Sequence, residues 1–211
     1  MLDRFTSLIG DTVALAGSVI GYRKGTEEPP YRAEPLVNGV ELRHYLPRLA
    51  AETTVFAASR EAALQTGFRR LAGYIFGGNH RHGAVAASTS EHETAPGGQK
   101  IAMTAPVAQD GDAEQGWDVR FYLPAAWTVQ TLPEPDDNRV RIVELPAQTV
   151  AVLRFSGDRR ADAICRRTEQ LREALRATGF DSRDEATAWF YDPPWTLPPL
   201  RRNEVAVPVD V

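Results

Sequence analysis

The most constraining feature of this chain is a pattern of apolar runs that occurs twice, about one hundred residues apart. An apolar run, a proline and a second apolar run lie around Pro47, and the same arrangement lies around Pro146. In both copies the second run ends nine residues after the proline, at Phe56 and at Phe155. Short apolar runs bounded by proline are typical of strands. The repeat therefore predicts a fold made of two similar halves.

A helix is predicted after each pair of strands, because apolar residues recur there at three- and four-residue steps. Ser59 and Asp158 are the expected N-caps, since their side-chain oxygens accept from free N–H groups of a first turn. Gly77 and Gly179 are expected to end the helices, where a left-handed residue is favoured. The two apolar stripes are Leu64, Phe68, Leu71 and Ile75 in the first helix, and Ile164, Thr168, Leu171 and Leu175 in the second.

Each helix is followed by two further strand-like segments, which span 100–107 and 117–124 in the first half and 186–194 and 203–209 in the second. Two strands, a helix and two strands do not make enough sheet to cover one half, so we expect the halves to share a sheet with both helices packed on it. We predict an α+β fold, a pseudo-two-fold distorted eight-stranded antiparallel β-barrel flanked by two α-helices. The two repeats run over about residues 30–125 and 139–210.

Residues 1–25 are predicted to form an amphipathic helix outside the main domain, which is assigned to residues 28–211. Asp3, Arg4 and Asp11 interrupt this segment, so it is too broken for a membrane span of about twenty apolar residues. A docking helix is the favoured interpretation. Peripheral membrane contact through residues 1–24 and an export signal are the alternatives.

Composition excludes several classes of partner. The net charge is −4 with both signs interspersed, and no Lys/Arg run with interleaved aromatic residues is present, so we expect no nucleic-acid binding. The chain has one cysteine, Cys165, which excludes an intrachain disulfide and the C-x-x-C-H motif of covalent heme attachment. A chain held together without disulfides suits a reducing compartment, and we expect a cytoplasmic protein.

The stretch "VELRHYLP" places one imidazole in an apolar row. In a strand, Val40, Leu42 and His44 share one face, while Arg43 and Tyr45 point the other way. A neutral imidazole on a rigid strand is a good metal ligand, but histidines in a core are also often satisfied by an ordinary hydrogen bond. The sequence leaves both interpretations of His44 open.

Seven segments in order resemble the SOUL heme-binding protein family, and together they cover the chain from about Glu28 to Val209. The resemblance implies an eight-stranded distorted barrel with two helices, in agreement with the repeat. It also implies noncovalent binding of heme b or another tetrapyrrole in an apolar cleft beside the first helix. The segments are "EPPY", "ELRHY", "GFRRLAGYIFGGN", "KIAMTAPV", "VRFYLP", "RFSG" and "YDPPWTLPPLRRNEVAV".

The resemblance also suggests site residues. His44 stands where some members of the family have a histidine proposed as the iron ligand, although other members lack it. A heme needs an apolar wall for its macrocycle and cations for its propionates. The candidates for the wall are Leu64, Phe68, Leu71, Tyr74, Ile75, Met103 and Trp195, and the candidate cations are Arg69, Arg70 and Lys100.

Two alternatives remain open. The chain lacks G-x-S-x-G, P-loop, H-E-x-x-H and dinucleotide motifs, so we expect a binding protein and no enzyme. A hydrolase or a ligand-sensing barrel would instead use one buried carboxylate of raised pKa, with Glu52, Glu144 and Glu204 as candidates. In the loop 78–99, solvated histidines are favoured over a metal site made by His80, His82 and His92.

Overall fold

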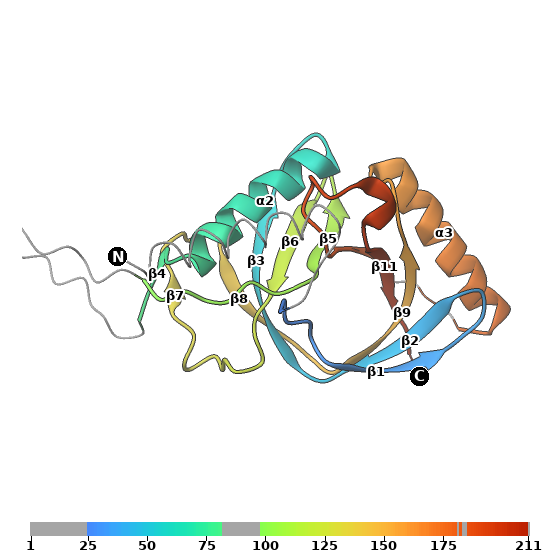
Figure 1. Cartoon of the computed structure of the whole chain (residues 1–211), viewed down its shortest axis with the longest axis horizontal. Helices are drawn as coiled ribbons and strands as arrows, with labels where there is room; N and C mark the ends of the chain where they lie inside the picture. Colours follow the sequence, from blue (N-terminus) through green and yellow to red (C-terminus); the bar gives the residue numbers. More distant parts are fainter. Residues whose placement is uncertain (1–24, 82–97, 181, 183–184, 211) are drawn as a thin grey trace, which may run out of the picture.

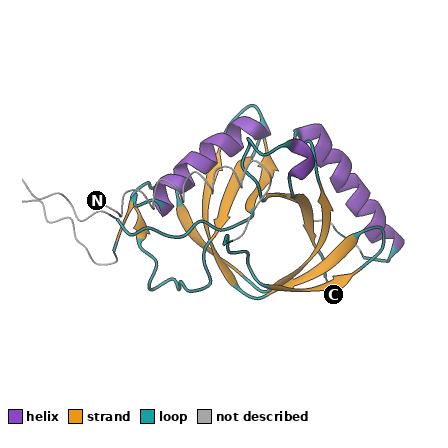
Figure 2. Ribbon diagram, viewed as in Figure 1, coloured by secondary structure: helices purple, strands orange, loops and turns teal. Residues whose placement is uncertain are grey.

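The computed structural model describes residues 25–81, 98–180, 182 and 185–210. Nine strands form one strongly curled antiparallel sheet, and two helices pack on its outer side (Figure 1). The ribbon in Figure 2 shows the strands as an inner layer and the helices as an outer one. The strands of this sheet are β1 Tyr31–Pro35, β2 Val40–Tyr45, β3 Arg48–Val55, β5 Val107–Asp112, β6 Gly116–Tyr122, β8 Arg141–Leu145, β9 Gln148–Phe155, β10 Thr187–Phe190 and β11 Asn203–Pro208.

The order of the strands is β1-β2-β9-β11-β10-β5-β6-β3-β8. Without β1, the strands of the first repeat follow the same order from one edge of the sheet as those of the second repeat follow from the other edge. The equivalent strands are β2 and β8, β3 and β9, β5 and β10, and β6 and β11. The predicted α+β fold with pseudo-two-fold symmetry is therefore confirmed. The sheet has nine strands where eight were expected, and β1 and β8 form its two edges, so the barrel is curled and open. A further pair, β4 Asn79–His80 and β7 Glu134–Pro135, lies beside it.

The first helix, α2 Arg60–Ile75, forms where the sequence predicts it. The Ser59 side chain accepts a hydrogen bond from the Ala62 N–H, which confirms the predicted cap. Gly77 follows the helix with a φ of 115°, a conformation that favours glycine. A Cβ atom at Gly67 would lie 2.6 Å from Val119 on β6, so this glycine lets α2 pack closely on the sheet.

The second helix, α3 Ala161–Ala177, begins later than its predicted cap. Arg160 is the N-cap residue and makes no side-chain capping bond, while Asp158 only accepts from the Arg160 N–H at 3.1 Å. The prediction that Asp158 caps this helix is therefore wrong, because the chain makes one more turn before the helix starts. The first turns of the two helices meet, since the Ala161 N–H donates to Glu61 of α2.

The strand predicted over 100–107 is also displaced. Residues 98–106 run without a regular ladder along the end of α2, where the Ile101 N–H donates to the Ile75 carbonyl at 2.8 Å, and β5 begins only at Val107. Pro106, directly before it, has no N–H to give to a ladder. Within the described ranges, no helix is long and apolar enough to cross a membrane. The predictions for residues 1–24 and for most of the loop 78–99 lie outside the described residues.

Candidate functional site

Three of the predicted wall residues lie in the core between α2 and the sheet. Leu71, Tyr74 and Ile75 are 0, 2 and 1% exposed, and the Tyr74 hydroxyl donates to the Pro133 carbonyl at 2.9 Å. They pack with Val119 and other residues of the strands below. In this structure they stabilise the contact between helix and sheet and present no surface to a ligand.

Other predicted wall residues remain accessible. Phe68 on α2 is 38% exposed and lies edge-on against buried Phe121, with ring centres 5.2 Å apart. Met103, in the segment along the end of α2, is 37% exposed. Leu64 is partly buried and packs against the cores under both helices. The contact with Phe121 holds the Phe68 ring in place while one side of it faces outward.

Two of the predicted cations are free to meet a ligand. Arg69 and Lys100 are exposed, and Lys100 directly precedes Ile101, which is hydrogen-bonded to the end of α2. Arg70 is instead tied to β3, because its guanidinium donates to the Thr53 hydroxyl at 3.3 Å and to the Thr54 carbonyl at 3.1 Å. Of the three predicted cations, Arg69 and Lys100 are therefore the exposed ones.

Phe76, the residue after α2, was missed as a candidate. It is 61% exposed and lies eight residues after Phe68, about 12 Å further along the helix axis. The helical spacing of the apolar stripe stops at Ile75 and gives no signal for Phe76. We call Phe68, Phe76 and Met103 with Arg69 and Lys100 the α2 surface.

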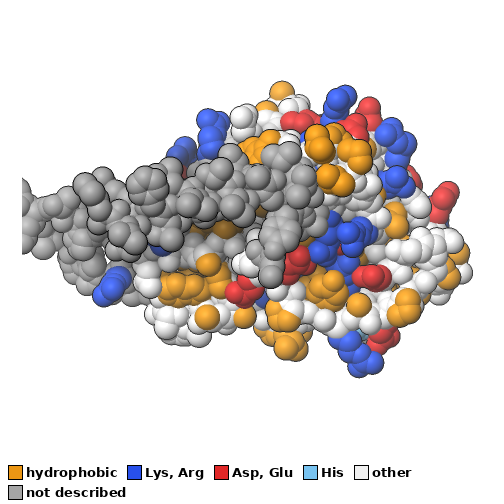
Figure 3. All heavy atoms as spheres, viewed as in Figure 1, with side chains coloured by type: hydrophobic (Ala, Val, Ile, Leu, Met, Phe, Trp, Pro, Cys, Tyr) orange, Lys and Arg blue, Asp and Glu red, His pale blue; other side chains and the backbone are white. Residues whose placement is uncertain are grey.

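Trp195 lies at the opposite end of α2 from Lys100. It is 56% exposed in the proline-rich segment 192–200, which is held beside the start of α3 by a bond from the Gly157 N–H to the Pro198 carbonyl. Figure 3 shows hydrophobic side chains gathered on this part of the surface. The starts of the two helices meet, and α2 is about 24 Å long at 1.5 Å per residue, so the structure does not bring Trp195 next to Lys100.

His44 belongs to the other half of the sheet. It lies on β2, which pairs with β1 and β9, far from α2 in Figure 1. Its Nδ1 lies 2.9 Å from the Thr149 hydroxyl, and its Nε2 is shielded from solvent, 3.7 Å from a carboxylate oxygen of Glu34. The structure therefore does not join His44 to the α2 surface, and binding of iron by Nε2 would require Glu34 to move.

The inner side of the curled sheet carries buried charges, among them the candidate carboxylates Glu52 and Glu204. Figure 3 shows basic and acidic side chains gathered over the opening that the sheet encloses in Figure 1. Arg43 of β2 is 3% exposed, although it follows the apolar Leu42. The alternation of side chains along β2 correctly places Arg43 and Tyr45 on the opposite face from Val40 and Leu42. Residues on both faces of β2 are buried, however.

The first charged cluster surrounds Glu204, which is fully buried on β11. Arg43 donates two hydrogen bonds to its carboxylate at 2.7 and 3.1 Å, Arg202 donates one at 2.9 Å, and the Tyr191 hydroxyl donates another at 2.7 Å. Burial by itself raises the pKa of a carboxyl group, but the bonds and charges of Arg43 and Arg202 outweigh it and lower the pKa of Glu204.

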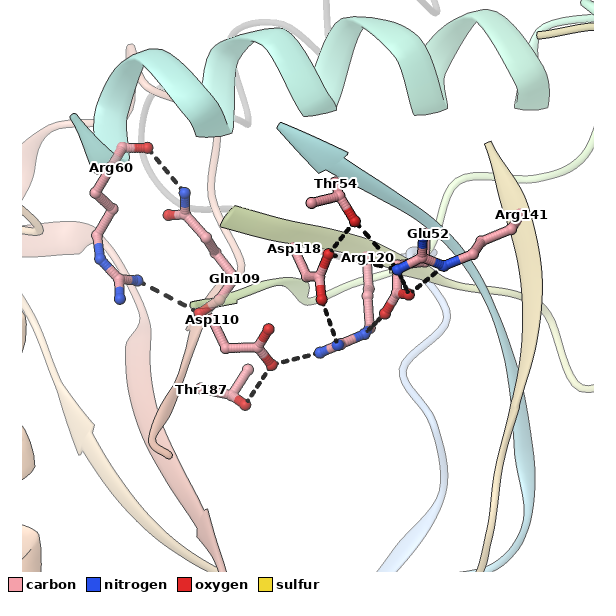
Figure 4. A network of polar contacts seen from close by, with 9 residues as sticks. All are labelled: Glu52, Thr54, Arg60, Gln109, Asp110, Asp118, Arg120, Arg141 and Thr187. Carbon is pink, nitrogen blue, oxygen red and sulfur yellow. Dashed lines mark hydrogen bonds and ion pairs between the residues drawn. The ribbon is translucent and has the colours of Figure 1, made fainter. Parts of the chain in front are cut away.

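The second charged cluster surrounds Arg120 of β6 (Figure 4). Its guanidinium contacts Glu52 and Asp110 and lies 3.6 Å from Asp118. Glu52 also pairs with Arg141 at 2.6 Å. In Figure 4 the side chains around Arg120 come from β3, β5, β6 and β8, and Thr187 of β10 donates to Asp110. Arg60 of α2 and Gln109 form a separate pair of hydrogen bonds.

None of the three candidate carboxylates suits a hydrolase. Glu52 is ion-paired, Glu144 is exposed, and the pKa of Glu204 is lowered. A buried acid that works at neutral pH needs a raised pKa and a free proton position. The carboxylate required by that alternative is therefore not provided by these residues.

The described part of the histidine-containing loop provides no metal site. His80 lies 2.6 Å from Asp136 through Nδ1 and 3.4 Å from Glu134 through Nε2, so it joins β4 to the β7 region as an ion pair. The hydrogen bond to Asp136 raises the pKa of His80. No cluster of three or more His, Cys, Asp or Glu residues with metal-binding geometry occurs among the described residues. His82 and His92 lie outside them.

Comparison with known proteins identifies the family. The model of the SOUL heme-binding protein family matches residues 26–208. The chain belongs to this family. It is 30% identical over 184 residues to human heme-binding protein 2, covering 83% of this chain and 80% of the human protein. It is 28% identical over 203 residues to mouse heme-binding protein 2, covering 88% of this chain and 90% of the mouse protein.

Solved structures share the fold at low sequence identity. The C-terminal domain of EcmrR superposes with a TM-score of 0.57 at 11% identity, over 85% of this chain and 98% of that domain. A hydrolase from Listeria innocua superposes with a TM-score of 0.54 at 10% identity, over 83% of this chain and 94% of the hydrolase. These similarities show that the SOUL chain shares its fold with proteins of other kinds, and they carry no information on its chemistry.

Proposed function

We propose that this SOUL protein binds heme b or a related tetrapyrrole noncovalently at the α2 surface and acts as a heme carrier or buffer. The observation that carries the proposal is the exposed Phe68 ring, held edge-on by Phe121 within a family named for heme binding. A tetrapyrrole offers a broad apolar face, and an immobilised aromatic ring can pack against it at little cost in conformational entropy.

The rest of the α2 surface supports this location. Phe76 and Met103 add exposed apolar area, which on a monomer is a mark of a binding surface when it is contiguous. Arg69 and Lys100 are exposed and suited to charge-assisted hydrogen bonds with propionates. Cys165 is the single cysteine and no C-x-x-C-H motif is present, so the attachment is noncovalent.

His44 is not required for this binding. Its Nε2 is covered and its strand belongs to the other half of the molecule, so a tetrapyrrole on α2 gains its affinity from apolar contact and from the two cations. His44→Ala should leave the affinity for hemin unchanged within about twofold, whereas loss of an iron ligand would cost far more.

The test is a hemin titration followed by Soret absorbance with the full chain. We expect saturable binding, which Phe68→Ser weakens by about tenfold, since a half-exposed aromatic contact of this size is worth about 1–2 kcal/mol. Phe56→Ser is the matched control, because Phe56 is 74% exposed at the end of β3 and lies outside the α2 surface. Equal affinities of the two serine variants, or binding that does not saturate, would refute the proposal.

A further inference from the structure

Among the described residues, the inner side of the sheet contains one arginine whose guanidinium is shielded from solvent and has no ionic partner. Arg48, the first residue of β3, places its guanidinium carbon 4.1 Å from the ring centre of Tyr45 and 5.2 Å from that of Tyr122. All three of its side-chain nitrogens are shielded from solvent and lie outside good hydrogen-bond geometry to any acceptor in the described structure, although the guanidinium interacts electrostatically with the Tyr122 hydroxyl. The two tyrosine rings attract the cation but leave its N–H groups unused.

A second unused donor lies against the same two rings. Trp189 of β10 is 3% exposed, and its indole N–H also lacks an acceptor in the part of the chain that the structure describes. Its ring meets Tyr45 edge-on at 5.9 Å and Tyr122 at 6.4 Å. We call these four residues, Tyr45, Arg48, Tyr122 and Trp189, the Arg48 site.

The arginines of the two charged clusters are neutralised. Arg43 and Arg202 share the Glu204 carboxylate and pair also with Glu41 and Glu28. Arg120 and Arg141 share Glu52, and Arg120 has Asp110 and Asp118 beside it. The Arg48 site thus combines one unbalanced positive charge with buried donors that have no acceptor. A buried donor left unsatisfied costs about 1–3 kcal/mol, and more when it is charged. An acceptor supplied from outside the chain would remove this cost.

We infer that the Arg48 site binds the carboxylate of a small aromatic monoacid. The guanidinium matches a carboxylate with two parallel hydrogen bonds, and one unpaired charge calls for a monoanion. Ala50 and Val152 are 0 and 1% exposed and pack in the same cluster as the tyrosines and Trp189, so the ring of the acid would have to enter between these apolar side chains. A dianion such as phosphate would exchange one unbalanced charge for another.

The Arg48 site is separate from the α2 surface. On β3 and β6, Ala50 and Tyr122 belong to the cluster on the inner side of the sheet, whereas Ala51 and Phe121 belong to the core under α2. The two sites therefore lie on opposite faces of one sheet. The inference goes beyond heme binding, and the two can be tested independently.

The experiment follows thermal unfolding and heat of binding of the full chain during titration with benzoate. Benzyl alcohol serves as the neutral analogue, acetate lacks the ring, and inorganic phosphate supplies a multiply charged anion. We expect benzoate to bind saturably and to raise the unfolding temperature. Acetate and phosphate should bind at least about tenfold more weakly than benzoate, and benzyl alcohol should not bind. Equal binding of benzyl alcohol, or tighter binding of phosphate, would overturn the inference.

Variants locate the effect. Arg48→Met should lower benzoate affinity by at least about tenfold, and it is expected to fold because it removes a charge that has no partner. Arg48→Lys keeps the charge without the planar fork and should bind with intermediate affinity. Arg176→Met, at an exposed arginine in the last turn of α3, is the matched control and should bind like the wild type. Unchanged benzoate affinity in Arg48→Met would refute the site.

A competition experiment separates the two proposals. Saturating benzoate should leave the hemin titration of the wild type unchanged, and Arg48→Met should bind hemin normally. Displacement of hemin by benzoate would show that the carboxylate site belongs to the heme site, which contradicts the inference that it is separate. Failure of hemin to bind would refute the α2 proposal alone, as long as benzoate still binds.

Discussion

The two charged clusters on the inner side of the sheet distribute their charges in opposite ways. Around Glu204, one fully buried carboxylate serves two guanidinium groups and a tyrosine hydroxyl. Around Arg120, one guanidinium serves three carboxylates, and Arg141, which is 54% exposed, supports two of them. The same two-fold strand arrangement thus holds one cluster whose arginines meet at one buried acid, with Glu28 and Glu41 at its margin, and one cluster whose acids meet at one arginine.

The difference indicates which cluster tolerates the loss of a member. Breaking a buried ion pair leaves an uncompensated charge and is far more costly than removing one member of a partly solvated network. The Glu204 cluster is therefore expected to control stability, and the Arg120 cluster to be more forgiving.

The largest effect is expected for Glu204→Gln. The change leaves Arg43 with only the half-exposed Glu41 as a partner, so the free energy of unfolding should fall by about 3 kcal/mol. Urea unfolding of the wild type and the variant measures this loss. A change below about 1 kcal/mol would show that Glu41 and solvent compensate Arg43, and would remove the contrast between the clusters.

Low pH should also weaken the Glu204 cluster and lower the free energy of unfolding. The pKa of Glu204 is lowered from its ordinary value of 4.5, so its contribution to stability is fully present above pH 4.5 and is lost as the pH falls through the folded-state pKa. The unfolding free energy of the wild type should therefore decline in acid more steeply than that of Glu204→Gln. Glu144→Gln, at an exposed carboxylate, is the control, and parallel profiles for all three proteins would contradict the assignment.

A smaller effect is expected for Glu52→Gln. Arg120 keeps Asp110 and Asp118, and Arg141 is largely solvated, so the loss should be about 1–2 kcal/mol in the same unfolding assay. A loss equal to that of Glu204→Gln would mean that the second cluster is no more forgiving than the first.

The smallest effects concern the helix starts of the two halves. Ser59→Ala removes a capping bond and should cost about 1 kcal/mol. Asp158→Ala removes only an exposed bond to the Arg160 amide and should cost less than about 0.5 kcal/mol. Similar losses in thermal or urea unfolding would show that Asp158 acts as a cap in solution.

The helices were predictable from their periodic apolar residues. Whether an apolar stripe packs on the sheet or faces a ligand was not predictable. The helical spacing of Leu71 and Ile75 correctly predicts a helix with one apolar side, yet a side that packs on a sheet and a side that lines a ligand site have the same spacing. Phe68 packs one side of its ring on Phe121 of β6 and leaves the rest exposed, and Phe76 follows the last residue of α2 and is exposed. Which part of the stripe stays uncovered depends on the position of Phe121 and its neighbours in space.

The ion pairs between residues far apart in the chain were equally invisible in the sequence. Arg43 and Glu204 are 161 residues apart, and only the order β2-β9-β11 brings their strands within reach of one another. The strand expected over 100–107 failed for a related reason, because in that segment the Ile101 N–H donates to the Ile75 carbonyl at the end of α2 and the Ala105 N–H donates to the Glu27 carbonyl, both outside the sheet.

The amino-acid sequence by itself determined the two halves, the places of both helices and the two faces of each strand, because these follow from local periodicity and from capping and turn residues. Only the tertiary structure decided which faces are covered, which charges meet and which donors stay unused. Those outcomes depend on how a nine-stranded sheet curls, and curvature brings together residues that no local pattern relates.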